Sequence, residues 1–349
     1  MLEISVCVVV YNAMEHIQEC LDSLMALEYP QEHFEVLFID NNSTDGTKEL
    51  LQYYDTHYPH VRTLINPVLG IAGSRNLALK RAHFDYVAFT DSDCVVPPNW
   101  LSKLANGFEK YSKEEPSLVA VGGSNSPPKH TSLFYDTLDL MLNTFLGSHG
   151  SVQGRRFDKD RYVPHIPTVN IMYHKPTVLR AGGFDVTFGN IAEDRDLSYR
   201  LEKFGHRFIY LTDTVISHKI RPTWQSWLKN MYVYGKGRMW LMRKHPDKID
   251  VMLFAPVLLI FSMFFPFLSF IAPYFALPLF YFPCLLAASM MTSLRAKRIV
   301  LTPMLFFLYV GTHFAYGLGQ IAGLFRNREF YRLESSKALV VKAERGRVD

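Results

Sequence analysis

The chain has 349 residues, of which 48% are hydrophobic and 20% are charged, and its formal net charge is +4. This length predicts about two domains, and the composition excludes a disordered, collagen-like or coiled-coil protein. Because residues 1–218 hold 19 Lys and Arg against 27 Asp and Glu, whereas residues 219–349 hold 18 against 6, we expect an acidic globular part followed by a basic part in a different environment.

Strand and helix patterns alternate from the N-terminus. The apolar run at residues 4–10 predicts a strand, because it is too short for a signal peptide and no basic segment precedes it. Thr47 or Ser43 is the expected N-cap of a helix that follows the second strand. The alternation is typical of βαβ units, so we predict an α/β fold with a mostly parallel sheet. Its first elements are a strand over 4–10, a helix over 15–27, strands over 34–39 and 61–65, a helix over 73–82 and a strand over 86–89.

Polar side chains follow the predicted strands at their carboxyl ends, where parallel sheets bind ligands. Asn12, Asp40, Asp91 and Asp93 occupy these positions. In Asp91-Ser92-Asp93, two carboxylates directly follow an apolar strand, and such oxygen ligands suit Mg²⁺ or Mn²⁺ bound together with a substrate phosphate. The alternative is a pair of turn-capping aspartates, and we favour the metal site because the motif ends a buried strand.

A second acidic cluster follows the Gly-Gly-Phe-Asp sequence at residues 182–185. Residues 193–201 have helical spacing and begin with three carboxylates within four residues. A carboxylate at this point can serve as a general base that removes a proton from a hydroxyl group, although acidic residues in a first helical turn also stabilise the helix dipole. We expect the first role for Asp194 and the second for Asp196.

Residues 219–250 begin the basic part of the chain. Between 219 and 248 there are eight Lys or Arg residues and one acidic residue, interleaved with tryptophan and tyrosine. Cations mixed with aromatic side chains favour an interfacial helix on anionic lipid headgroups. The alternative is a basic solvated helix, and nucleic-acid binding is disfavoured because an apolar segment follows directly.

Residues 251–294 form a run of 44 residues without Asp, Glu, Lys or Arg. A helix needs about 20 apolar residues to span a bilayer, so we predict transmembrane helices over about 251–272, 274–294 and 299–325, with a turn at Pro273 and Tyr274. Buried helices of a soluble protein are the disfavoured alternative. The positive-inside rule then predicts a multi-pass protein of the cell membrane whose globular domain is cytoplasmic.

The C-terminal tail over 326–349 leaves two topologies open. Three spans place the tail outside, whereas its seven basic and four acidic residues favour the cytoplasmic side. A tilted or re-entrant third segment would return the tail to the cytoplasm, and the glycines of that segment would permit it.

The motifs together resemble those of glycosyltransferase family 2. The resemblance rests on residues 8–12, 38–47, 73–76, 91–93, 182–185 and 193–197, which stand in order over some 200 residues. It implies a GT-A (Rossmann-like) domain over 1–218, with a nucleotide-sugar-binding half over 1–100 and an acceptor half over 101–218. Family members invert the anomeric centre by direct displacement from a nucleotide sugar.

The resemblance also implies a role for each matching residue. Asp194 would be the catalytic base, assisted by Glu193, and Asp93 would hold Mn²⁺ or Mg²⁺ with His218 as a further ligand. Trp224 or Trp227 would stack on the acceptor sugar. The residues implied to bind the donor are Tyr11, Asn12, Asp40, Arg75 and Asp91.

One departure from processive relatives bears on the reaction. Those enzymes carry a Gln-x-x-Arg-Trp motif, whereas here no Arg-Trp follows Gln225. We therefore expect a hexosyltransferase-type enzyme of cell-envelope glycan biosynthesis that moves a single sugar, from a UDP-sugar in preference to other nucleotide sugars, to a lipid-linked or glycan acceptor. A polyprenyl-phosphate sugar synthase is one alternative. A non-catalytic membrane scaffold or transporter subunit is another, which the intact Asp93 and Asp194 disfavour.

Overall fold

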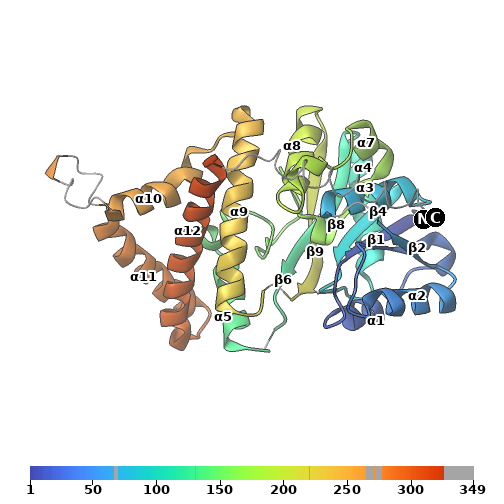
Figure 1. Cartoon of the computed structure of the whole chain (residues 1–349), viewed down its shortest axis with the longest axis horizontal. Coiled ribbons are helices and arrows are strands. Elements are labelled where there is room, and N and C mark those ends of the chain that lie inside the picture. The colour runs from blue at the N-terminus through green and yellow to red at the C-terminus, as the bar shows by residue number, and fades with distance from the viewer. Residues whose placement is uncertain (67–69, 130, 220, 265–269, 272–276, 326–349) are drawn as a thin grey trace, which may run out of the picture. The chain divides into compact units, whose positions relative to one another are not determined.

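The computed structural model describes residues 1–66, 70–129, 131–219, 221–264, 270–271 and 277–325 (Figure 1). These residues form two compact units. Unit 1 comprises residues 1–126 and 151–219, and unit 2 comprises 127–150 together with the described residues after 219. The sequence analysis did not anticipate that 127–150 groups with the C-terminal helices.

Unit 1 is built on a nine-stranded mixed sheet in the order β3-β2-β1-β4-β8-β6-β9-β5, with β7 beside β9. β1 lies parallel to β2 and β4, and β2 lies parallel to β3, as the βαβ pattern predicts. β8 is antiparallel to both of its neighbours, so the α/β prediction is confirmed but the sheet is mixed. The strands are β1 (Ile4–Val10), β2 (Phe34–Asp40), β3 (Val61–Ile65), β4 (Tyr86–Asp91), β5 (Cys94–Val95), β6 (Leu118–Ser126), β7 (Arg161–Val163), β8 (Ile171–His174) and β9 (Arg207–His218).

Helices cover both faces of this sheet because its strands are apolar on both sides. In β1, Val6 and Val8 face one buried cluster and Cys7 faces the other. In Figure 1, α1 and α2 lie on one side of the first strands and α3 lies on the other. The helices of unit 1 are α1 (Ile17–Met25), α2 (Thr47–His57), α3 (Ile71–Arg81), α4 (Trp100–Glu114), α7 (Lys175–Arg180) and α8 (Glu193–Lys203).

The N-cap of α2 is Gly46, so the expectation of Thr47 or Ser43 was wrong. Gly46 has a φ of +97°, a backbone conformation that glycine adopts without strain. Thr47 is already the first helical residue, and its hydroxyl donates to the Asp45 carboxylate at 2.6 Å. The Ser43 hydroxyl is bonded to Asp40 instead, which leaves it no role at the helix end.

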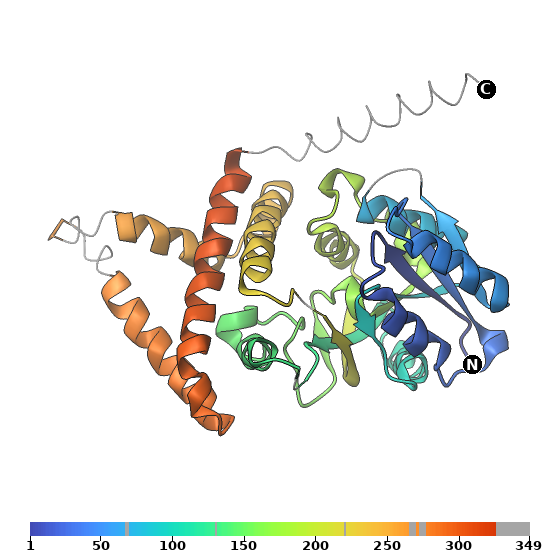
Figure 2. The same cartoon turned by 60° about the horizontal axis from the view of Figure 1, so that its bottom comes forward.

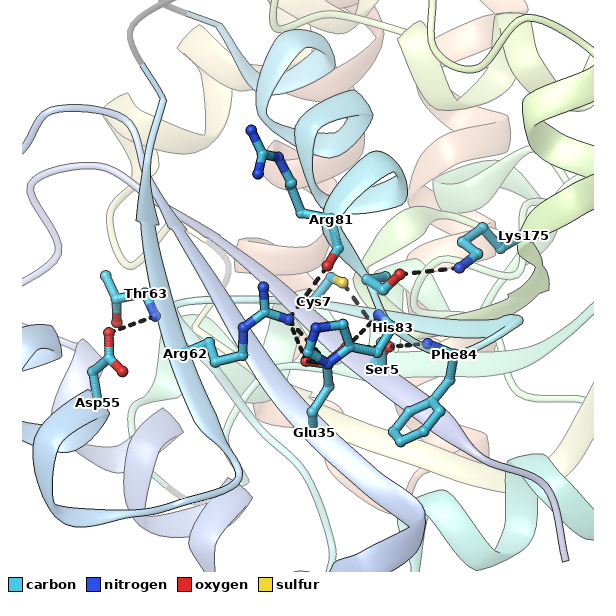
Figure 3. A network of polar contacts seen from close by, with 11 residues as sticks. Ser5, Cys7, Glu35, Asp55, Arg62, Thr63, Arg81, His83, Phe84 and Lys175 are labelled. Atoms are coloured by element: carbon cyan, nitrogen blue, oxygen red, sulfur yellow. Dashed lines mark hydrogen bonds and ion pairs between the residues drawn. The ribbon is translucent and has the colours of Figure 1, made fainter.

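A polar network fixes the amino-end edge of the sheet (Figure 3). At its centre the buried Glu35 carboxylate accepts hydrogen bonds from the Ser5 hydroxyl at 2.6 Å, from Arg62 Nη1 at 2.7 Å and from the His83 backbone N–H at 2.7 Å. Burial alone would raise the pKa of Glu35, but these three donors together lower it below the usual Glu value. One carboxylate therefore ties β1, β2, β3 and the loop before β4 together.

We expect Glu35→Gln to lower the free energy of unfolding by about 2 kcal/mol at neutral pH, because hydrogen bonds to a charged group are worth roughly 1.5–3 kcal/mol. Since the pKa of Glu35 is lowered in the folded protein, the stabilisation that its carboxylate provides is present above the ordinary Glu pKa of about 4.3. This stabilisation is lost as the pH falls through the lowered pKa. Denaturant unfolding at neutral pH and at about pH 4 measures both effects. The exposed Glu32→Gln is the matched control, and an equal loss in that variant would contradict the assignment.

Unit 2 is helical, and α9 and α12 lie side by side within it in both views (Figure 2). Small residues allow this close approach, since a Cβ on Gly319 would lie 1.9 Å from the Tyr232 carbonyl oxygen and one on Gly235 would lie 2.0 Å from that of Tyr316. The helices of unit 2 are α5 (Leu133–Leu142), α6 (Phe145–Ser148), α9 (Trp224–Lys244), α10 (Ala255–Phe264), α11 (Leu277–Arg295) and α12 (Thr302–Phe325).

The predicted interfacial segment over 219–250 contains the helix α9, and its placement at a lipid surface stays a prediction. Its Tyr232 and Tyr234 side chains are exposed, but Trp227 and Trp240 are buried within unit 2. The Trp227 indole N–H donates to the Thr312 hydroxyl of α12 at 2.9 Å. These two tryptophans therefore pack the helix pair and do not form a row facing lipid.

Among the described residues, one helical stretch is long and apolar enough to cross a membrane, Ile299–Phe325. It includes α12, which is continuous over 24 residues, so a re-entrant break within that helix does not occur. The other two predicted spans fall partly outside the described residues, the turn at Pro273 and Tyr274 lies wholly outside them, and the number of three spans stays a prediction. The tail over 326–349 also lies outside them.

Candidate functional site

The carboxyl ends of β1, β2 and β4 meet at one edge of the sheet. Val10 pairs with Asp40 and Val9 pairs with Asp91, so the predicted donor-side residues lie together as expected. Tyr11, just beyond β1, is 58% exposed, so its aromatic side chain is accessible from solvent. Asn12 follows it with a φ of +46°, and its side-chain oxygen accepts a hydrogen bond from the Thr44 N–H at 2.9 Å.

The Asp40 side chain does not reach the surface at which a ligand would bind. It is fully buried, and its carboxylate accepts hydrogen bonds from the Ser43 hydroxyl at 2.5 Å and the Ser43 N–H at 3.0 Å. The Asn12 backbone N–H donates to the same hydroxyl at 2.9 Å. Asp40 therefore holds the loop after β2 against Asn12, and a contact with a nucleobase requires this loop to rearrange.

Strand pairing brings Asp93 and His218 together. β5 begins one residue after Asp93 and pairs antiparallel with the end of β9, which sets Cys94 opposite His218. His218 Nε2 lies 3.3 Å from Asp93 Oδ1. One ligand atom from each of Asp93, Cys94 and His218 lies within 4.8 Å of the others. Mn²⁺ and Mg²⁺ prefer hard oxygen ligands to thiols, so Asp93 is the ligand of this cluster that suits either cation, and the His218 imidazole is a nitrogen ligand within reach of the same ion.

Asn125 supports His218 from the other side of the imidazole ring. Its Nδ2 lies 2.7 Å from His218 Nδ1, while its Oδ1 is buried and has no hydrogen-bond partner among the residues that the structure describes. Rotating this amide by half a turn would pair Oδ1 with a protonated Nδ1 and leave the Nε2 lone pair free for a metal ion. Metal-binding histidines are commonly oriented by such a contact.

Arg75 joins the end of β4 to the start of α8. It is 5% exposed, its Nη1 pairs with the Glu193 carboxylate, and its Nη2 lies 3.4 Å from Asp91 Oδ1. Burial raises the pKa of Glu193 to about 7 with a further contribution from Asp194, although the Arg75 guanidinium opposes the shift. Glu193 is thus a buried partner of Arg75, and Arg75 brings the donor-side edge and the first turn of α8 into one site.

Asp194 is the accessible carboxylate of that first turn. Its side chain is 21% exposed, and Oδ1 accepts a hydrogen bond from the Arg195 N–H at 2.7 Å. Burial alone would raise the pKa of Asp194, but His165, Arg75 and Arg195 together lower it. Its carboxylate is therefore ionised at neutral pH, as a general base requires.

Asp196 has a structural role, as the sequence analysis expected. It is fully buried and accepts a hydrogen bond from Arg200 Nε at 2.9 Å. The Arg200 guanidinium in turn donates to the carbonyl oxygens of Ala181 and Gly183 at 2.5 Å. The pair fastens the Gly-Gly turn to α8.

The two tryptophans assigned to the acceptor lie in unit 2. Trp227 is only 3% exposed and its indole is bonded to Thr312, so the expectation that it stacks on a sugar was wrong. Trp224 is partly buried against α12, and an acceptor contact stays a prediction for this residue.

Sequence reasoning missed His165, Ser198 and Asn125. His165 lies between Pro164 and Pro167 and contacts Asp194 and Ser198, although it stands 29 residues before Asp194 in the chain. No periodicity or motif marks a lone histidine in such a loop. Ser198 could have been found from its spacing, because it stands four residues after Asp194 and residues i and i+4 of a helix lie on the same face.

Comparisons with known proteins agree with this geometry. Residues 5–176 match the family model described as Glycosyl transferase family 2. Glycosyltransferase AglE of Haloferax volcanii is 28% identical over 244 residues, which cover 68% of this chain and 74% of that protein. Poly(ribitol-phosphate) beta-glucosyltransferase of Bacillus spizizenii is 33% identical over 138 residues, which cover 39% of this chain but only 22% of that protein.

A solved structure shares the fold. Mannosyltransferase PcManGT from Pyrobaculum calidifontis, in complex with GDP-Man and Mn²⁺, superposes with a TM-score of 0.56 at 20% identity and covers 91% of this chain and 87% of its own. Asp194 and His218 lie beyond the residues that match the family model, so their roles depend on the geometry described above.

Proposed function

Because this chain is a glycosyltransferase with a glycosyl transferase family 2 domain, we propose that it moves a single sugar from a nucleotide-diphospho-sugar to a lipid-linked or glycan acceptor at the cytoplasmic face of the cell membrane. The observation that carries the proposal is the bridge made by Arg75. It contacts Asp91 at the donor-side edge and Glu193 beside Asp194, so donor and base are held in one site. A UDP-sugar is the favoured donor class by resemblance to the family.

The proposed reaction is an inverting displacement. The Asp194 carboxylate accepts the proton of an acceptor hydroxyl while the hydroxyl oxygen bonds to the anomeric carbon. The bond from that carbon to the diphosphate oxygen breaks, and the nucleoside diphosphate leaves with the bonding electrons. Asp93 and His218 would hold a divalent cation, which supplies positive charge to the leaving diphosphate. The Mn²⁺ in the complex of the fold neighbour supports this assignment.

Membrane anchoring is supported by the apolar stretch Ile299–Phe325 and by the excess of basic residues after 219. We propose that unit 2 holds the enzyme at the bilayer surface, with the basic part of the chain on the cytoplasmic side. An anchored enzyme meets acceptors that are themselves confined to the membrane.

A donor screen tests the proposed function. The full chain in isolated membranes is incubated with UDP-glucose, UDP-N-acetylglucosamine, UDP-galactose or GDP-mannose and Mn²⁺, and the masses of the lipid and aqueous extracts are compared with those of membranes lacking the protein. We expect one donor to give a lipid that is heavier by one sugar, and chelation with EDTA to abolish it. A polyprenyl-phosphate monosaccharide would identify the synthase alternative. A product confined to the aqueous extract would contradict a lipid-linked acceptor.

A further inference from the structure

His165 lies directly behind the carboxylate of Asp194. The imidazole is 6% exposed, and its two nitrogens face different groups. Nε2 lies 3.7 Å from Asp194 Oδ2, at ion-pair distance, and Nδ1 lies 2.9 Å from the Ser198 hydroxyl. Ser198 is fully buried one turn further along α8, and its hydroxyl donates to the Asp194 carbonyl oxygen at 3.0 Å. His165 therefore contacts the side chain of Asp194, and Ser198 contacts its backbone carbonyl oxygen.

The hydrogen bonds assign the protons of this group. A serine hydroxyl has one proton, and that of Ser198 is used on the Asp194 carbonyl oxygen. With its proton on that carbonyl oxygen, the hydroxyl accepts from His165, which corresponds to the tautomer that carries a proton on Nδ1. An unprotonated Nε2 would direct its lone pair at the Asp194 carboxylate. The arrangement is attractive when Nε2 is also protonated, as an imidazolium beside a carboxylate.

Other charged groups surround Asp194. Arg75 approaches from α3 and Arg195 follows in α8, and both favour the ionised carboxylate. Glu193 stands beside it on α8, and Asp91 lies at the end of β4, and the like charge between each of them and Asp194 disfavours the ionised carboxylates. Tyr173 of β8 is fully buried, and its pKa is raised by burial and by Asp194, so the phenol stays neutral. Arg75 and Arg195 are thus two permanent cations near Asp194, and His165 adds a third positive charge when Nε2 is protonated.

We propose that His165, aimed by Ser198, is a positioning residue for the base: it holds the Asp194 carboxylate ionised and oriented toward the acceptor hydroxyl. The inference rests on the proposed role of Asp194 and adds to it a buried histidine that lies in none of the motifs named in the sequence analysis. After the hydroxyl proton reaches Asp194, the protonated imidazole favours release of that proton and return of the carboxylate. A histidine that only fills space in the core would contribute neither effect.

The pH profile of kcat distinguishes a positioning role of His165 from a role that only fills space in the core. It is measured on the full chain in detergent by release of nucleoside diphosphate from whichever of UDP-glucose, UDP-N-acetylglucosamine, UDP-galactose or GDP-mannose is turned over. For His165→Ala we expect kcat to fall about tenfold to hundredfold, a range typical for loss of a supporting contact, with the donor KM nearly unchanged. Because removing a nearby cation raises the pKa of a carboxylate, the acid limb should move to higher pH. Added imidazole should restore part of the rate.

Two further variants keep the test decisive. Ser198→Ala retains the imidazole but removes the hydroxyl that orients it, so the acid limb should move in the same direction by a smaller amount. This variant tests the proposal even if His165→Ala fails to fold. His174→Ala is the matched control, since His174 makes a similar contact with a hydroxyl, 2.8 Å from Thr177 Oγ1, away from Asp194. It should leave the pH profile unchanged.

An unshifted acid limb in both His165→Ala and Ser198→Ala would overturn the role of His165. If Asp194→Asn abolishes transfer at the same time, the proposed function still stands. Transfer that survives Asp194→Asn would instead overturn the proposed function itself.

Discussion

Asp194→Asn should lower kcat for sugar transfer by about a thousandfold while leaving the protein folded. General-base catalysis typically contributes between about a hundredfold and ten-thousandfold, and an amide cannot accept the proton of the acceptor hydroxyl. The substitution preserves the shape of the side chain and the oxygen that accepts the Arg195 N–H. The measurement is the initial rate of transfer at saturating donor, together with a thermal unfolding curve of each protein.

Asp196→Asn is the matched control for this prediction, because it changes a carboxylate of the same helical turn. Asp196 is fully buried and its bond to Arg200 fastens the Gly-Gly turn. We expect this variant to lose stability but to retain much of the rate at a temperature where it is folded. Equal loss of rate in both folded variants would show that the first turn of α8 acts through its structure and not through the Asp194 base.

Asp93→Asn should lower the transfer rate by at least about a hundredfold, and His218→Ala should raise the Mn²⁺ concentration needed for half-maximal rate. Divalent cations in such sites are held by one or two protein ligands together with substrate phosphates, so each lost ligand weakens both cation and donor binding. Titrating the initial rate with Mn²⁺ after EDTA treatment measures both effects. In the structure the two side chains lie 3.3 Å apart, within reach of one ion.

Cys94→Ala provides the control for the metal site, because its thiol lies in the same cluster but is a soft ligand. It should leave the Mn²⁺ dependence unchanged. Wild-type activity that persists in EDTA, or an Asp93→Asn variant with the wild-type Mn²⁺ curve, would contradict a metal ion at Asp93 and His218 that the reaction needs.

Local patterns predicted the first half of unit 1 closely. The strand predicted over 4–10 has the same bounds as β1. The strand predicted over 86–89 begins at the predicted residue and ends two residues later, at Asp91. Each of these elements depends on neighbours close in sequence. The insertion of β8 between β4 and β6 depends on pairing between distant segments, such as Val87 with Tyr173, which no periodicity reveals. The same holds for residues 127–150, because Thr137 and Thr144 are hydrogen-bonded to Met304 and Tyr309 of α12, more than 160 residues later.

The candidate site was predicted as a set of residues but not as a set of contacts. The motifs indicated Arg75, Asp91 and Glu193 separately, and the structure shows one guanidinium bonded to both carboxylates. Trp227 was assigned to a sugar because its type suits stacking, yet burial against α12 decides its role. Residue type and spacing thus indicate what chemistry is available, whereas burial and partners decide which group performs it.

The most direct test of the account is the configuration of the anomeric carbon in the product. The proposed mechanism is a single displacement in which Asp194 deprotonates the acceptor as the diphosphate leaves. An α-linked nucleotide sugar should therefore give a β-linked product, which the one-bond carbon–proton coupling constant at the anomeric carbon reports by NMR. An α-linked product would mean that the configuration is retained, which a single displacement assisted by a base does not give, and it would contradict the role of Asp194 as the base.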